Sequence, residues 1–440
     1  MKRSLMALAA LAGTPAAAQE QPAPPAPPAS AVTASAPLRA RIDGLVPLLN
    51  GGGDFDGFFG AAFRAQVPRA QFDAIGTQLR AALGRALAVA SVTPVTPWSA
   101  QVQLRFEQGN VNAQIAVDPN LPHLVTGLRV SGAEASETSL EGVRAALAAL
   151  PGRTALSVAR LDAAGPQPVV AHAAATPLAI GSAFKLVILA ELVRATNAGE
   201  RRWSDTVRLD GRPLPGGRYT QRPAGTAVPL QELAEAMISV SDNSATDILL
   251  WHLGRTRVEA MLAPIGWRDG AAATRPFLAT LEAFKIKGIG TLASRWRTTD
   301  EVGRRTLLAG EVAAMPASAI PSTLFQDGRP LGIETVEWFA SADDLVRTLD
   351  WLRRNTEGPT GATARAILSK NPGIPGAAAG WAWVGYKGGS EPGVINMSFL
   401  LQARDGSWRS VVASWNDPAQ AINDTRFMSL VARAVELAGR

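Results

Sequence analysis

The spacing of hydrophobic and polar residues changes from a helical period to strand alternation near residue 100. Apolar residues at helical spacing predict three helices, over residues 38–49, 55–65 and 69–87. Apolar and polar residues then alternate around residues 102–106 and 111–115, which predicts strands. Helices followed by a meander of about four strands predict a small α+β domain over residues 38–132, with the helices packed on a curved sheet.

The pattern from residue 154 onward predicts a second domain that extends to residue 440, with residues 133–153 as the connector. Strand patterns precede and follow a long helical stretch, at residues 154–162, 168–173, 381–387, 395–403 and 407–414. Helices are predicted within that stretch and at its end, over residues 230–240, 244–253 and 419–437. This order predicts an α+β fold, with an antiparallel five-stranded sheet flanked by helices and an all-helical subdomain.

The N-terminal residues carry the features of an export signal and a linker. Lys2 and Arg3 precede a short apolar run and Ala16-Ala17-Ala18, as in a secretory signal peptide. We therefore expect residues 1–18 to be a cleavable signal and residues 19–37, rich in Pro and Ala, to be an extended linker. No later segment has the roughly 18 uninterrupted apolar residues of a membrane-spanning helix. The predicted location is periplasmic or secreted, without an integral membrane segment.

The composition of the 440 residues excludes several kinds of function. The formal net charge is +6, but the Arg residues are scattered without a basic run, so we expect a solvated surface and no nucleic-acid binding. The absence of Cys excludes disulfides and a thiol nucleophile. His123, His172 and His252 lie far apart in the sequence, which argues against a metal site or a Ser-His-Asp triad. We therefore expect no cofactor and no metal.

Lys is rare in this chain, which makes its positions informative. Only six of the 43 basic residues are Lys, at positions 2, 185, 285, 287, 370 and 387. A buried ammonium can lose its proton, whereas a guanidinium stays charged. Only Lys185 has a Ser three residues before it, and Ser182 begins an apolar run typical of a helix. This spacing places both side chains on one helix face within hydrogen-bond reach, and the free N–H groups of a helix start suit an oxyanion. The alternative is a Ser that only caps a helix, followed by a surface Lys.

Two further motifs follow in a fixed order. Ser241-Asp242-Asn243 lies 59 residues after Ser182, and Lys387-Gly388-Gly389-Ser390 ends a predicted strand. The order S-x-x-K, S-D-N, K-x-G resembles the serine β-lactamase and penicillin-binding-protein superfamily, most closely the class A β-lactamase-like serine hydrolases. The resemblance covers residues 154–440. Residues 276–284 and 387–393 look like those of exported two-domain members with an N-terminal α+β domain of the cystatin/NTF2 type. The lactamase-like protein of clavam-biosynthesis clusters has a similar layout.

The resemblance implies a catalytic role for each motif. Ser182 is implied to be the acylated nucleophile and Lys185 the base that activates it. Ser241 is implied to relay a proton to the leaving nitrogen, and Lys387 to hold the substrate carboxylate and tune Ser241. Independently of the family, a buried Lys beside a second ammonium has its charged form disfavoured by desolvation and by like charge, so it can be neutral near pH 7.

The resemblance also implies which residues bind the substrate. Asn243 would contact the substrate amide and Lys185. The backbone N–H groups of Ser182 and Ser390 would form the oxyanion hole, and Gly389, the last residue of the K-x-G motif, lies beside them in the sequence. The implied substrate is a small molecule: a β-lactam, an ester or a peptidoglycan-like peptide.

The chain departs from the class A pattern in two places. Its third motif reads Lys-Gly-Gly instead of Lys-Thr-Gly, so a hydroxyl that helps to hold the substrate carboxylate is missing, and Ser390 is a candidate to replace it. The E-x-x-L-N segment, whose Glu positions the deacylating water in class A enzymes, is also absent after Ser241. Glu282 is the only carboxylate within residues 277–287 and is a candidate catalytic residue in its place. The alternative is a helix-surface Glu paired with Lys285.

Three functions stay open on the sequence alone. The leading hypothesis is an exported serine hydrolase that acts through an acyl-enzyme on Ser182, with β-lactam hydrolysis as its nominal reaction. An esterase or D,D-peptidase-like enzyme with poor β-lactam turnover would use the same site. A sensor of β-lactams or cell-wall fragments would be acylated without turnover. The interval from Ser241 to Lys387 is 146 residues, longer than in compact class A enzymes, and the resemblance implies that the additional residues, within 285–335, form a cap over the site. The natural substrate, the role of the N-terminal domain and the oligomeric state are not predicted.

Overall fold

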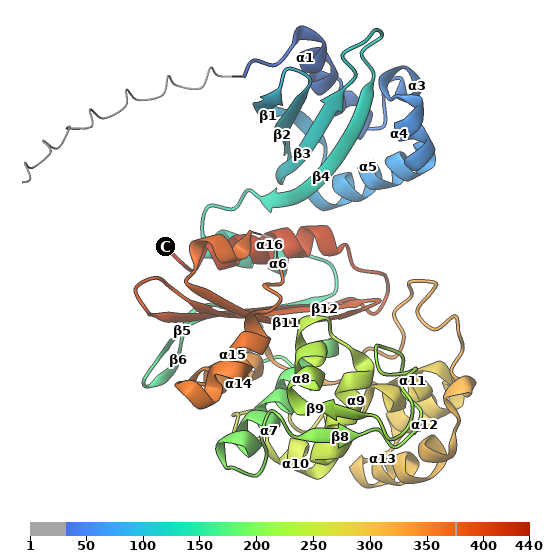
Figure 1. The fold of residues 1–440 in the computed structure, drawn as a ribbon, viewed down its shortest axis with the longest axis vertical. Coiled ribbons are helices and arrows are strands. Elements are labelled where there is room, and N and C mark those ends of the chain that lie inside the picture. The colour runs from blue at the N-terminus through green and yellow to red at the C-terminus, as the bar shows by residue number, and fades with distance from the viewer. Residues whose placement is uncertain (1–31, 375) are drawn as a thin grey trace, which may run out of the picture.

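The computed structural model of the protein describes residues 32–374 and 376–440 (Figure 1). The predicted signal peptide and the predicted linker up to residue 31 lie outside the described residues. The predicted linker extends too far at its C-terminal end, because residues 36 and 37 already belong to helix α1 (Ala36–Asp43). The hydroxyl of Ser35 accepts from the N–H of Leu38 at 3.3 Å and caps this helix.

The N-terminal unit packs helices against one antiparallel sheet. Its helices are α1, α2 (Leu45–Leu49), α3 (Phe55–Phe58), α4 (Ala61–Gln66) and α5 (Arg69–Leu83). Its strands follow the order β1 (Ala86–Thr96), β2 (Ser99–Phe106), β3 (Gly109–Val117) and β4 (Val125–Ala135). Alternate residues of β2 and β3 are buried and form one core with apolar residues of the helices, so the strand periodicity of the sequence marks the face that the helices cover.

The helices of this unit differ from the sequence prediction at their glycines. The helix predicted over residues 38–49 is interrupted at Gly44, and the helix predicted over residues 55–65 is interrupted at Phe59 and Gly60. The third helix ends at Leu83, because Gly84 takes a φ of 77° that favours Gly and the chain then enters β1. The likeness of this unit to the cystatin/NTF2 type stays a prediction.

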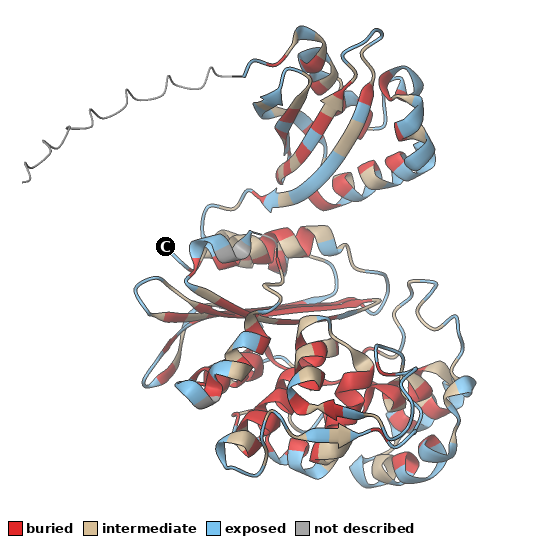
Figure 2. Ribbon diagram, viewed as in Figure 1, coloured by how far each residue is buried: buried red, intermediate tan, exposed pale blue. Residues whose placement is uncertain are grey.

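The C-terminal unit is built on a five-stranded antiparallel sheet, which confirms the predicted fold class. Its order is β11 (Trp383–Glu391), β12 (Val394–Gln402), β13 (Trp408–Asn416), β5 (Arg153–Asp162) and β6 (Gly165–His172). Helices α6 (Leu140–Ala148) and α16 (Asp424–Leu437) cover the face toward the N-terminal unit, so the predicted connector 133–153 contains a helix. Helix α14 (Ala342–Asn355) covers the other face, and α7 (Lys185–Asn197) packs against it. Strands β12 and β13 are buried on both faces for this reason (Figure 2).

A largely helical subdomain lies beside the sheet. Its helices are α8 (Leu230–Ser239), α9 (Asn243–Leu253), α10 (Arg255–Ala260), α11 (Thr280–Gly288), α12 (Gly290–Thr298) and α13 (Glu301–Leu307), and α15 (Ala362–Ser369) packs between α8 and β11. The prediction of an all-helical subdomain is wrong in detail, since β8 (Thr206–Arg208) pairs with β9 (Ala227–Pro229) within it. A second ladder, of β7 (Leu178–Ala179) with β10 (Phe339–Ala340), matters for function because β7 leads directly to Ser182.

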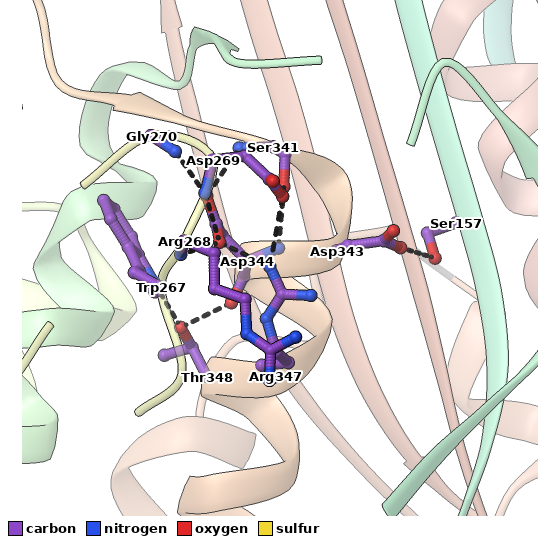
Figure 3. A network of polar contacts seen from close by, with 10 residues as sticks. All are labelled: Ser157, Trp267, Arg268, Asp269, Gly270, Ser341, Asp343, Asp344, Arg347 and Thr348. Atoms are coloured by element: carbon purple, nitrogen blue, oxygen red, sulfur yellow. Dashed lines mark hydrogen bonds and ion pairs between the residues drawn. The ribbon is translucent and has the colours of Figure 1, made fainter. Parts of the chain in front are cut away.

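A polar network fixes the start of α14 next to this second ladder (Figure 3). The buried carboxylate of Asp344 accepts from the backbone N–H groups of Arg268 and Gly270, each at 2.8 Å. The hydroxyl of Ser341 in turn accepts from the N–H of Asp344 at 2.9 Å and caps the helix. Burial alone raises the pKa of Asp344, but the hydrogen bonds from Arg268 and Gly270 bring it below its ordinary value. Because β10 directly precedes Ser341, the network also holds the partner strand of β7.

The two units meet at α16. Arg426 donates to the carbonyl of Gln108 at 3.0 Å and pairs with Glu137 at 2.7 Å, and the side chain of Asn423 donates to the carbonyl of Gln78 at 3.3 Å. In the described parts of the chain, no helix combines the length and apolar character needed to cross a bilayer.

Candidate active site

Ser182 lies in a 3₁₀ turn, Gly181–Phe184, between β7 and α7. Gly181 has a φ of 47°, and a Cβ there would lie 2.9 Å from the backbone nitrogen of Ser390, so only Gly lets the turn approach β11. Gly389 is restricted in the same way, since a Cβ there would overlap the backbone nitrogen of Ser182. The backbone of the Ser182 turn is therefore in contact with the strand end at Ser390, as the predicted oxyanion hole requires.

Lys185 is the first residue of α7 and is fully buried. Its Nζ donates to the carbonyl of Ser241 at 2.7 Å, to Oδ1 of Asn243 at 2.7 Å and to Oγ of Ser241 at 3.1 Å. The predicted contact between Lys185 and Asn243 is therefore present. The hydrogen bond between Lys185 and Ser182 that the spacing predicted is not formed between these two described residues, because the Lys185 donors are taken up by the S-D-N segment.

The S-D-N segment connects α8 to α9 and is held in a strained conformation. Asp242 is the N-cap of α9, and its carboxylate accepts from the N–H of Ala245 at 2.8 Å. Ser241 takes a φ of 58°, a conformation that costs a residue other than Gly on the order of 1–3 kcal/mol. The helix cap and the bonds to Lys185 hold Ser241 in this conformation, with both its carbonyl and its hydroxyl directed at Lys185.

Lys387 approaches the Ser241 hydroxyl from β11. Its Nζ donates to the carbonyl of Gly388 and lies 3.0 Å from Oγ of Ser241. The Ser241 hydroxyl thus contacts two Lys nitrogens, of Lys185 at 3.1 Å and of Lys387 at 3.0 Å. A hydroxyl carries one proton and two lone pairs, so Ser241 can accept from one nitrogen and donate to the other when that nitrogen is neutral. The arrangement is suited to passing a proton.

Burial changes the charge state of both Lys residues. It lowers the pKa of Lys185 from 10.5 to about 7, against the opposing effects of Asp247 and Asp242. Burial also lowers the pKa of Lys387 well below 10.5, and the charge of Lys185 lowers it further. A Lys that can be neutral near pH 7 is therefore present, as the sequence predicts. Burial is thus the main cause at both residues, and the like-charge effect that the sequence predicts for Lys185 acts on Lys387.

Asp247 is a buried carboxyl group that the sequence interpretation missed. It lies on α9 and accepts from the N–H groups of Thr280 at 2.7 Å and Leu281 at 2.9 Å, which joins α9 to the start of α11. Burial raises its pKa to about 7, although these hydrogen bonds act in the opposite direction. Its signal in the sequence is a lone acidic residue in an apolar helix, six residues after Ser241.

Two cavities meet at Ser182. The larger has a volume of about 710 Å³ and contains Ser182, Ser241 and Lys387 in its wall. All three residues predicted to bind substrate line it as well: Asn243, Gly389 and Ser390. The smaller cavity, of about 280 Å³, shares Ser182, Asn243 and Ser390 and is bounded by aromatic side chains, Phe284, Phe325 and Trp338. The stretch predicted as a cap, residues 285–335, contributes Gly328 to the larger cavity and Phe325 to the smaller one.

Glu282 belongs to the start of α11 and lines neither cavity. Its Oε1 accepts from Arg255 at 2.5 Å and its Oε2 accepts from the N–H of Ala279 at 2.8 Å. The pairing with Lys285 that the alternative predicted is wrong, since Lys285 donates to the carbonyl of Val312 at 2.9 Å. The structure therefore gives Glu282 a helix-capping and ion-pairing position and not a place facing Ser182.

A buried charged cluster next to the smaller cavity was also missed. Lys287 Nζ donates to Oε1 of Glu337 at 2.7 Å and to Oε1 of Glu391. Both carboxylates line the cavity that contains Ser182. Glu391 directly follows the Lys387 to Ser390 motif, and this position is the only signal that the sequence offers for it.

The described residues offer no metal site. Among residues 32–374 and 376–440, no group of three or more His or acidic residues is arranged to hold a metal ion. His172 lies 3.2 Å from the Thr154 hydroxyl, and His123 stacks on Trp98, so both take part in packing.

The family comparison locates this site within a known group of proteins. The model of Beta-lactamase2, the beta-lactamase enzyme family, matches residues 141–309, which contain Ser182, Lys185 and the S-D-N segment. Over these residues the chain is similar to the beta-lactamase enzyme family. The resemblance to the serine β-lactamase and penicillin-binding-protein superfamily is thereby confirmed, and membership of class A stays a prediction. No curated protein matches the chain.

The chain is also similar to several solved structures. A β-lactamase from Sphaerobacter thermophilus is 19% identical with a TM-score of 0.47, over 68% of this chain and 95% of that chain. A β-lactamase from Chitinophaga pinensis is 16% identical with a TM-score of 0.46, over 68% and 96%. The protein PBP-A is 15% identical with a TM-score of 0.46, over 68% and 93%. At this level of similarity the matches say nothing about the substrate.

Proposed function

We propose that the protein is an exported serine hydrolase that forms a covalent acyl-enzyme on Ser182, with β-lactam ring opening as its nominal reaction. One observation carries the proposal: the Ser241 hydroxyl lies between the nitrogens of Lys185 and Lys387, in the wall of a cavity that also contains Ser182. The alternative of a helix-capping Ser followed by a surface Lys does not agree with the complete burial of Lys185.

Acylation begins with the removal of a proton from Ser182. Neutral Lys185, which makes up about half of the molecules near pH 7, takes the proton from Oγ of Ser182 as this atom attacks the substrate carbonyl carbon. Because the two side chains are not hydrogen bonded in the free protein, the transfer requires that substrate binding bring them together. The N–H groups of Ser182 and Ser390 would then bind the oxyanion that forms.

The proton is then delivered to the leaving atom. Lys185 returns it through the Ser241 hydroxyl, which passes its own proton to the leaving nitrogen or oxygen of the substrate as the bond to the carbonyl carbon breaks. Lys387 lies on the other side of Ser241. Its Nζ can donate a hydrogen bond to Oγ of Ser241 and so stabilise this oxygen while its proton is transferred. A substrate carboxylate near Lys387 would stabilise its ammonium form, so an anionic substrate completes the charge arrangement of the site.

A second candidate is an esterase or D,D-peptidase-like enzyme that hydrolyses β-lactams poorly. The position of Glu282 favours it, because the carboxylate predicted to activate the deacylating water is engaged by Arg255. The nucleophile and the acylation step are the same for both candidates. They differ in the rate at which a β-lactam-derived acyl group leaves Ser182.

Turnover assays separate these functions. The chain from about residue 19 onward, with its Ser182→Ala variant as control, is mixed with a chromogenic cephalosporin, a penicillin and an activated ester. Cephalosporin turnover that is lost in the variant supports the leading proposal. Ester turnover with a persistent penicillin adduct supports the second candidate, and an adduct without any turnover indicates a sensor. Neither turnover nor an adduct contradicts all three. The mass of the product that a bacterial host exports tests the predicted cleavage near residue 18.

A further inference from the structure

The smaller cavity beside Ser182 has a carboxylate wall that acylation does not use. Glu337 and Glu391 line it together with Ser182, and both contact the buried Lys287. Of the three side chains, Lys287 is 1% exposed, Glu337 2% and Glu391 12%. Glu391 also lines the larger cavity. Glu391 is therefore the member of the cluster that lines both cavities containing Ser182.

The cluster holds one cation and two carboxyl groups, so it has a net charge of −1 when both carboxyls are ionised. A buried net charge is costly, and the uptake of one proton removes it. Burial raises the pKa of Glu391 well above its usual range, and the charge of Glu337 raises it further, while Lys287 acts in the opposite direction. The second oxygen of Glu337 accepts from the N–H of Trp338 at 3.2 Å, so this carboxylate is fixed from two sides and Glu391 is left to exchange the proton.

We propose that Glu391 is the general base that activates water for hydrolysis of the Ser182 acyl ester. The inference rests on the proposed function and names the residue for its second step. A cavity of about 280 Å³ can hold several water molecules, each occupying about 30 Å³ in the liquid. Part of its wall is aromatic, from Phe284, Phe325 and Trp338, and this apolar surface lowers the local polarity around the carboxylates.

The step is balanced in atoms and charge. The step uses the ionised form of Glu391: a water oxygen bonds to the acyl carbon while one water proton moves to the Glu391 carboxylate, which brings the cluster to zero net charge. Because burial raises the pKa of Glu391, this form becomes more populated as the pH rises, and the deacylation rate should increase with it. The tetrahedral intermediate then breaks its bond between carbon and Ser182 Oγ, and the Glu391 proton is returned to Oγ. The products are a carboxylic acid and free Ser182, and Glu391 ends in its starting state. Lys185 is not needed as the base in this step.

The test separates acylation from deacylation in Glu391→Gln. Stopped-flow measurement of acyl-enzyme formation and decay, with a penicillin and an activated ester, gives the two rates, and intact mass follows the adduct. The expected result is an acylation rate within about threefold of wild type and a deacylation rate reduced at least about 100-fold, the contribution typical of a general base. The matched control is Glu282→Gln, which also removes a carboxylate paired to a cation and is expected to keep both rates.

Each other outcome has a distinct meaning. An acyl-enzyme that forms and decays at the wild-type rate in Glu391→Gln overturns the inference and leaves the proposed function intact. The absence of acylation in wild type itself refutes the proposed function instead. Should Glu391→Gln not fold, Glu391→Asp decides, because it keeps a carboxyl group at this position but shortens the side chain. Acylation is expected to persist and deacylation to slow in this variant, and deacylation at the wild-type rate would overturn the assignment to Glu391.

Discussion

The acylation rate should follow the ionisation of Lys185. Burial lowers its pKa from 10.5 to about 7, which corresponds to roughly 5 kcal/mol of preference for the neutral form. With this pKa, the neutral fraction is about 9% at pH 6, about 50% at pH 7 and about 91% at pH 8. If neutral Lys185 is the base, the acylation rate rises about tenfold between pH 6 and pH 8 and then levels off.

Single-turnover acylation by an activated ester, measured by stopped flow from about pH 5.5 to pH 9, tests this profile. Two variants test whether the pH dependence comes from the ionisation of Lys185. Lys185→Arg should not acylate at any pH in this range, because its guanidinium keeps its proton. Asp247, whose own pKa is about 7, raises the pKa of Lys185 when it is ionised, so Asp247→Asn should move the midpoint to lower pH. A rate that is independent of pH, or that keeps rising tenfold per pH unit through pH 9 as for an ordinary Lys, would refute the reasoning.

Three further changes probe the packing and the ionisation of the site. The unfolded chain keeps the Lys185 proton up to about pH 10.5 and the folded chain releases it near pH 7, so the free energy of unfolding should rise with pH between these values. The rise is at most about 1.4 kcal/mol per pH unit. Urea denaturation at several pH values measures the free energy of unfolding, and for Lys185→Met this free energy should not show the rise. Gly389→Ala should reduce acylation by about 100-fold or more and also lower the Tm, since its Cβ overlaps the backbone of the Ser182 turn; stopped-flow acylation of the folded variant, at a temperature below its Tm, checks this. Glu282→Ala should lower the unfolding free energy by about 1–2 kcal/mol through loss of the helix cap and the Arg255 pair, while both rates persist.

Much of the fold was predictable because its signals are local. The alternation of apolar and polar residues in β2 and β3 indicates a sheet with one covered face. The apolar runs of β12 and β13 indicate strands that are buried on both faces. The breaks at Gly44 and Gly60 were missed, since the apolar spacing continues across them. The short ladder of β7 with β10 joins residues that are far apart in the sequence, so no local pattern predicts it.

In the candidate site, too, the residues in short local motifs could be predicted from the sequence, whereas the contacts between distant segments could not. The acylation residues Ser182, Lys185, Ser241 and Lys387 lie in short motifs whose order could be recognised from sequence, and the structure brings their segments to one cavity. The spacing of Ser182 and Lys185 indicates only that their side chains are within reach of each other, and it could not predict that Lys185 donates to Ser241 and Asn243 instead. Glu282 was selected as the only carboxylate within residues 277–287, and the sequence alone cannot distinguish a carboxylate that faces a cavity from one that caps a helix.

The Lys287 cluster was not accessible from sequence. Its carboxylates, Glu337 and Glu391, lie 50 and 104 residues after Lys287. Each of the three residues is unremarkable alone, and their common burial is a property of the tertiary fold. The assignment of a base for deacylation therefore depends on the structure, whereas the assignment of the nucleophile depends on the sequence first.

The most direct test of the account is the location of the covalent adduct. Wild type, Ser182→Ala and Lys185→Arg are each given a short pulse of penicillin or activated ester, and intact mass and peptide mapping follow. The account predicts one added acyl group in wild type, located on the peptide that contains Ser182, and none in either variant. An adduct that persists in Ser182→Ala, or a wild type that reacts with neither probe, would contradict it.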